Sequence, residues 1–155
     1  MVLFKVKLVL NKLKNFNIKT KMKKYIVTFI LSFLTFAILG GVFANFIFLP
    51  EFANWHTLYP EAVRATPDFI SGFPVALIQI IGLIALVDSL KIATLSRGAV
   101  FGAVFSAGIW LIVDLQMVST TTFVSYSYVG LDAVLSAIMG AIGGGLVAWS
   151  LKKFA

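Results

Sequence analysis

Four apolar blocks constrain this chain more than any other feature of its sequence. They run over about residues 25–49, 69–90, 99–118 and 129–151. A helix of about 20 residues, rising ~1.5 Å per residue, crosses the ~30 Å hydrocarbon core of a bilayer. Because lipid offers backbone groups no hydrogen-bond partner, such blocks form helices and not open strands. The sequence therefore predicts an all-α polytopic membrane protein, a four-transmembrane-helix bundle in one domain over residues 25–153.

Composition agrees with a membrane protein and narrows its chemistry. The chain is 60% hydrophobic and 12% charged, whereas soluble domains carry about 25% charged residues. It has no cysteine and one histidine, which excludes disulfides, thiol chemistry and multi-His metal centres. It also lacks a Gly-rich phosphate loop, a nucleophile elbow and an HExxH motif. We therefore expect no metal and no cofactor, and the sequence leans against an enzyme without excluding one.

The basic residues indicate an orientation in the membrane. The net charge is +7, and eight of the thirteen basic residues precede Tyr25, which is typical of a membrane-facing segment and not of nucleic-acid binding. The link between the first two blocks has Arg64 as its one basic residue, and the link between the last two has no charge. The positive-inside rule then predicts both termini in the cytoplasm, N-in/C-in. The remaining basic residues on that side are Lys91, Arg97, Lys152 and Lys153.

The start of the chain leaves two questions open. Met22-Lys23-Lys24 and the apolar run after it resemble a secretory signal peptide, but the run continues to Leu49, so we favour a retained helix. Residues 1–21 mix Lys with Leu, Val and Phe, as a basic helix on the cytoplasmic leaflet would. They can also be interpreted as an upstream extension before Met22. We slightly favour this second interpretation. Residues 1–24 are thus predicted to be a basic cytoplasmic segment.

The third and fourth blocks each carry a stripe of small residues on one helix face. Residues four apart share a face, and small residues let membrane helices approach closely. We therefore predict tight antiparallel packing of these two helices, with an aspartate at the outer end of each stripe. The stripes are Gly98, Gly102, Ser106, Trp110 and Asp114 in the third block, and Asp132, Ser136, Gly140, Gly144 and Ala148 in the fourth.

The two aspartates, with Arg64 and His56, are the candidate polar site on the outer side. Acidic residues within membrane helices are costly and face the bundle interior, where they have a partner. One interpretation is structural, an ion pair of Arg64 with Asp114 or Asp132. The other is a proton or cation site open to the outside. Both remain open, and buried ion pairs more often serve structure alone.

Several smaller features also carry expectations. In the outer loop, residues 51–69, Trp55 and Tyr59 are expected to anchor at the membrane interface, and Asp68 to cap the second helix. Asp88 and Lys91 are spaced as a surface pair, and Gln79 is expected to tie helices together. The hydroxyls of residues 119–122 are expected to cap the third helix. Glycines 143–145 are expected to mark close packing.

The pattern resembles small four-helix integral membrane proteins of bacteria, of the class known as domains of unknown function. The resemblance covers residues 25–153 and implies an inner-membrane protein with four helices, without a known substrate or functional residue. Its motifs are short: residues 56–60 with Arg64, residues 114–115, residues 121–122, Asp132, and residues 143–145 with Ala148-Trp149.

Two functions follow from the sequence as hypotheses. The first is passage of a small ion, proton or solute, for which so small a chain is expected to form a homo-oligomer. The second is a non-catalytic structural protein whose glycine-rich faces pack against a membrane-protein partner. A membrane enzyme acting on a lipid or quinone, with His56 and a carboxylate as acid and base, has the least support.

Overall fold

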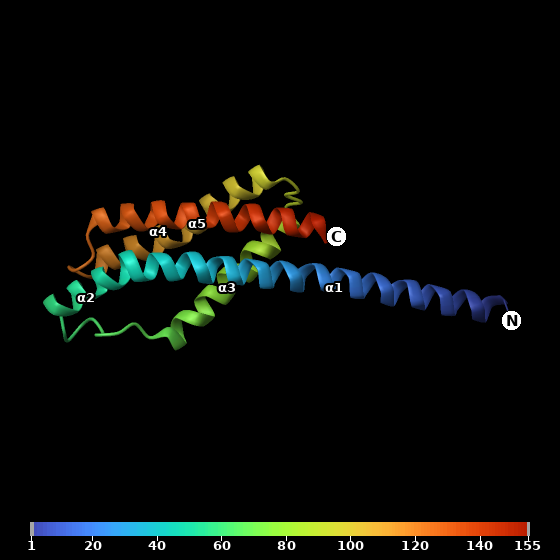
Figure 1. Ribbon diagram of the computed structural model, residues 1–155, viewed down its shortest axis with the longest axis horizontal. Coiled ribbons are helices and arrows are strands. Elements are labelled where there is room, and N and C mark those ends of the chain that lie inside the picture. The colour runs from blue at the N-terminus through green and yellow to red at the C-terminus, as the bar shows by residue number, and fades with distance from the viewer. Residues whose placement is uncertain (1, 155) are drawn as a thin grey trace.

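The computed structural model describes the backbone of residues 2–154 and the side chains of residues 22–154. The described part of the chain is all-helical, without a strand, as the sequence predicts (Figure 1). Four helical stretches are long and apolar enough to cross a membrane: Met22–Leu58, Phe69–Ser89, Leu95–Thr120 and Tyr126–Lys153. The elements in chain order are α1 Val2–Phe43, the π-helical turn η1 Ala44–Phe48, α2 Leu49–Leu58, α3 Phe69–Ser89, α4 Leu95–Thr120 and α5 Tyr126–Lys153.

The first helix is longer than the sequence predicts. We expected it to end near residue 49, with a loop beginning at residue 51, but helical structure continues to Leu58. Pro50 lies in the first turn of α2, where a missing N–H is tolerated. The preceding turn is π-helical, and the N–H of Leu49 bonds to the carbonyl of Ala44. Because of this wider turn, helical structure continues through Pro50, although a proline at this place in the sequence predicts a helix end.

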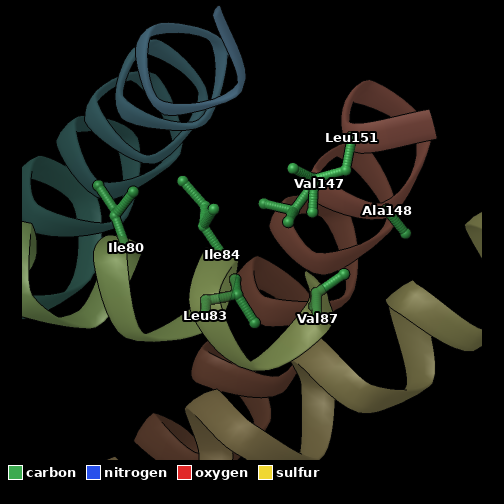
Figure 2. Close-up of a cluster of buried hydrophobic side chains, with 7 residues drawn as sticks. All are labelled: Ile80, Leu83, Ile84, Val87, Val147, Ala148 and Leu151. Carbon is green, nitrogen blue, oxygen red and sulfur yellow. The ribbon is translucent and has the colours of Figure 1, made fainter. Parts of the chain in front are cut away.

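Helix α5 lies at the centre of the bundle. It contacts α1, α3 and α4. Of the 18 most apolar consecutive residues of α5, 50% are buried, whereas 11–22% are buried in the corresponding stretches of the other three spans. Figure 2 shows one cluster of the core, in which apolar side chains of α3 point toward those of α5. The cluster consists of Ile80, Leu83, Ile84 and Val87 from α3 and Val147, Ala148 and Leu151 from α5.

Helix α1 is docked against the bundle by contacts with α5 and with α3. The hydroxyls of Thr28 and Ser150 are fully buried and hydrogen-bonded at 2.8 Å, and the ring of Phe36 packs on Gly143. Asp88 accepts hydrogen bonds from Lys24 at 2.8 Å and from the hydroxyl of Tyr25 at 2.7 Å. From its spacing in the sequence, Asp88 was expected to pair with Lys91. Its contact with α1 could not be predicted in this way, because the two segments are more than 60 residues apart.

The outer surface of the helices is strongly apolar. Large side chains are more than two-thirds exposed on several elements, where a soluble protein of this size would bury most of them. Such a surface is what helices present to lipid. Examples are Ile38, Phe46, Ile70, Val100, Val104 and Ile112.

Candidate functional site

The small-residue stripes of α4 and α5 lie against each other. A Cβ atom added to Gly98 would lie 2.5 Å from the Cβ of Ala148, and one added to Gly102 would lie 2.8 Å from the Cα of Gly144. An atom added to Gly140 would meet the backbone of Gly102 and the side chain of Ser106. The two helices therefore touch backbone to backbone, which leaves room for no side chain between them.

This packing brings Asp114 and Asp132 together. They are 3% and 6% exposed, and their carboxyl groups are close enough to interact electrostatically. The hydroxyl of Ser136 donates to Oδ1 of Asp132 at 3.0 Å. Oδ2 of Asp114 is buried without a hydrogen-bond partner among the described residues. Because an ionised carboxylate has acceptors and no donor, a bond between the two groups needs a proton that they share.

Arg64 does not join the two aspartates in the structure. Its side chain is 76% exposed, and its guanidinium lies 3.7 Å from the carboxylate of Asp68. Asp68 caps α3, as predicted, by accepting from the backbone N–H of Ile70 at 3.0 Å. Bonds from Ser71 and from this N–H lower the pKa of Asp68, with a smaller contribution from Arg64. Arg64 therefore pairs with the residue that caps the N-terminus of α3.

His56 also bonds elsewhere. Its Nδ1 lies 2.7 Å from the carbonyl oxygen of Val63. This contact ties the end of α2 to the link that leads to α3. Of the four residues of the candidate polar site, the structure therefore brings two together, Asp114 and Asp132.

An aromatic cluster lies where α2 ends and contacts α5 near the two aspartates. Trp55 is 5% exposed, and its ring centroid lies 4.7 Å from that of Tyr128 and 5.5 Å from that of Phe123. The expectation that Trp55 anchors at an interface is wrong: the extra helical turns of α2 carry its side chain into the bundle. Tyr59, 39% exposed, lies over Phe123. Tyr128 of this cluster lies one turn of α5 before Asp132.

The sequence reasoning missed Tyr128, which lies near the aspartates, and Glu51, which lies near Tyr128. Tyr128 lies within electrostatic range of Asp132, Asp114 and Glu51. Tyr128 precedes Asp132 by four positions, so the stripe of α5 could have been extended to it. Glu51 gave no such signal, because its place depends on the continuation of helix past Pro50.

The expectation that hydroxyls cap the end of α4 is confirmed for residues 119–121. The hydroxyls of Ser119 and Thr120 bond to the carbonyl of Gln116, at 2.8 and 2.9 Å, and that of Thr121 bonds to Met117 at 2.8 Å. These bonds cap the end of α4. Among the side chains of residues 22–154, no group of three His, Cys, Asp or Glu residues is placed to hold a metal ion.

The fold and the site define a class: an all-helical protein with four candidate membrane spans and a buried pair of acids between two of them. No protein-family model matches the chain, and neither the curated proteins nor the solved structures contain a significant match to it. The resemblance to a bacterial family therefore remains a prediction.

Proposed function

We propose that this chain is a multi-pass protein of a bacterial inner membrane, with both termini in the cytoplasm, that passes protons through the Asp114–Asp132 pair. The observation that carries the proposal is the buried oxygen of Asp114, which has no partner among the described residues and lies beside a second carboxyl group. A pair that shares one proton is a site that can gain or lose one.

The alternative, a purely structural ion pair, loses its motivation. It rested on Arg64, which lies on the exposed link and pairs with Asp68. An aspartate at the centre of a membrane helix costs about 2.5–3.5 kcal/mol on insertion scales, and one near a helix end, such as Asp114, costs less. An acid that lies within a membrane helix and has no basic partner among the described residues is a functional-site hypothesis by default.

The aromatic cluster lies next to the pair along α5 and would control entry from the outside. Trp55 packs against Tyr128, and Tyr128 lies on the same helix face as Asp132, one turn away. For a proton to reach the carboxyl groups from the outside, these rings have to move apart or admit a chain of water. Passage is therefore expected to be slow and to depend on the cluster.

The proposal is tested by proton flux into liposomes. Purified protein is reconstituted around a pH-sensitive dye, and a potassium gradient with valinomycin drives protons inward. We expect faster acidification than in protein-free vesicles, and loss of the difference in Asp114→Asn and in Asp132→Asn. The matched control is Asp68→Asn, because asparagine also caps helices and Asp68 lies outside the spans. Equal rates in protein-containing and empty vesicles would refute proton passage.

The structural-partner hypothesis drew on the glycine-rich faces of the third and fourth helices. Those faces pack against each other within this chain. What supports this second function is then the small number of reactive groups, on which the hypothesis also drew.

A further inference from the structure

A cavity of about 250 Å³ lies where the link between α3 and α4 meets the end of α5. These segments lie at the same end of the bundle (Figure 1). The floor of the cavity is apolar and buried, and is formed by Val87, Ala148 and Leu151, which Figure 2 shows on neighbouring helices. Two basic side chains, Lys91 and Lys152, are part of the wall, and both are exposed. A ligand that enters from the surface can therefore reach both lysines without displacing the core.

The charge of this cavity is positive. Neither lysine forms an ion pair within the part of the chain that the structure describes. Asp88 also lines the cavity, but its carboxylate lies 2.8 Å from the ammonium group of Lys24 and accepts a hydrogen bond from the hydroxyl of Tyr25. The ammonium group of Lys24 thus offsets the charge of Asp88, and two positive charges remain for a ligand.

The backbone of Lys91 is unusual for a lysine. The N–H of Lys91 bonds to the carbonyl of Asp88 at 3.1 Å, and the N–H of Ile92 bonds to the carbonyl of Val87 at 3.0 Å. These are the two bonds of a Schellman motif, in which the residue after the cap is left-handed and usually glycine. Lys91 stands there with a φ of 53°, as the one residue other than glycine with positive φ in the described part of the chain. A long side chain kept against this backbone preference indicates a role for its ammonium group.

The residues around the cavity indicate its depth in a bilayer. Leu90 and Leu95, at the two ends of the link, are 59% and 61% exposed, as side chains in contact with lipid are. On α5, Trp149 is 39% exposed, and the ammonium group of Lys153 lies 4.5 Å from its ring centroid. Tryptophan is enriched at the level of the lipid headgroups. In a bilayer, the two lysines of the cavity are therefore expected at the depth of the lipid phosphates.

We propose that the cavity binds the headgroup of one anionic phospholipid, with its phosphate between Lys91 and Lys152. The proposal rests on the membrane placement and orientation proposed above, and not on proton passage. Basic pockets between membrane helices on the cytoplasmic side are typical sites for anionic headgroups. The volume is below the ~300–1,000 Å³ of sites that enclose drug-sized ligands, so the cavity suits a headgroup whose acyl chains remain in the bilayer. A zwitterionic headgroup fits less well, because its own ammonium group would lie near the two lysines.

The test is native mass spectrometry of the full chain in detergent, titrated with phosphatidylglycerol or with phosphatidylcholine of the same acyl chains. We expect phosphatidylglycerol to bind ~30-fold more tightly, ~5-fold for each lysine, from the usual attraction of one basic residue to an anionic membrane surface. Equal affinity for the two lipids overturns the proposal. Displacement of phosphatidylglycerol by an equal concentration of inorganic phosphate would assign the cavity to a soluble anion and overturn it as well. Binding in detergent depends on neither orientation nor flux, so it can fail while the proposed function holds, and the reverse.

Paired variants with the same change in net charge make the test specific. Lys91→Gln combined with Lys152→Gln should reduce the affinity for phosphatidylglycerol ~30-fold, to that for phosphatidylcholine. The control pair, Arg97→Gln combined with Lys153→Gln, also removes two positive charges at this end of the bundle, but from residues outside the lining. It should bind as the wild type does. An equal loss in both pairs would show diffuse attraction to a basic surface and would contradict a site.

Lys91→Gly separates binding from folding. Glycine adopts positive φ without the steric penalty of a Cβ atom, so the thermal midpoint in detergent should stay the same or rise. The affinity for phosphatidylglycerol should nevertheless fall ~5-fold, because one ammonium group is lost. An unchanged affinity in this variant would contradict the role of Lys91.

Discussion

The effect of Asp114 on the free energy of unfolding distinguishes a structural role of this side chain from a functional one. If a basic residue neutralised it, its loss would cost about 3–5 kcal/mol. In the structure it faces a second acid instead. An amide at this position can donate to Asp132 in place of the shared proton. We therefore expect Asp114→Asn to keep the free energy of unfolding or to raise it by up to ~2 kcal/mol, as measured by the thermal midpoint in one detergent at neutral pH.

The contrasting residue is Ser136, whose hydroxyl donates to Asp132. Ser136→Ala removes a bond to the same pair without removing an acid. It should lower the free energy of unfolding by ~0.5–1.5 kcal/mol, the usual net contribution of one hydrogen bond, here between two residues one turn apart on α5. A large loss in Asp114→Asn would mean that the acid holds the bundle together, contrary to the role proposed for it.

At the scale of elements, the contact of α4 with α5 depends on the absence of side chains. A Cβ at Gly102 would meet backbone atoms of Gly140 and Gly144, and backbone cannot rotate away as a side chain can. We expect Gly102→Ala to lower the free energy of unfolding by ~1–3 kcal/mol, the usual cost of overpacking. Unfolding in a detergent series measures this change.

Gly108 on the same helix provides the control. An added Cβ there has no atom within 4 Å, and alanine favours helix over glycine by about 1 kcal/mol. Gly108→Ala should therefore leave stability unchanged or raise it slightly. If the two alanine variants were equally stable, the close contact between α4 and α5 would be wrong.

At the scale of the whole molecule, the prediction concerns orientation. The chain has no cysteine, so a single introduced thiol reports one position. Ala62 lies in the exposed link before α3, and Ala93 in the exposed link before α4. With both termini in the cytoplasm, a membrane-impermeant maleimide should label Ala62→Cys in intact cells and Ala93→Cys after permeabilisation. The reverse pattern would invert the bundle, and labelling of both in intact cells would refute the four-span topology.

The sequence by itself determined the class of fold and the contact between two helices. Both depend on short-range patterns: apolar runs long enough to span a bilayer, and small residues every fourth position that place Gly102 and Gly144 on flat faces. The same spacing placed Asp114 and Asp132 at equal depth. The caps at Asp68 and at residues 119–121 were also predicted, because a cap involves neighbours in the chain.

The tertiary structure alone decided which groups these residues meet. Whether Arg64 reaches the aspartates depends on where the helix before it ends, and a π-helical turn before Pro50 moved that end to Leu58. The same extension buried Trp55 against Tyr128. Which distant side chains contact each other depends on the path of the whole backbone. The spacing of residues within one segment does not determine it.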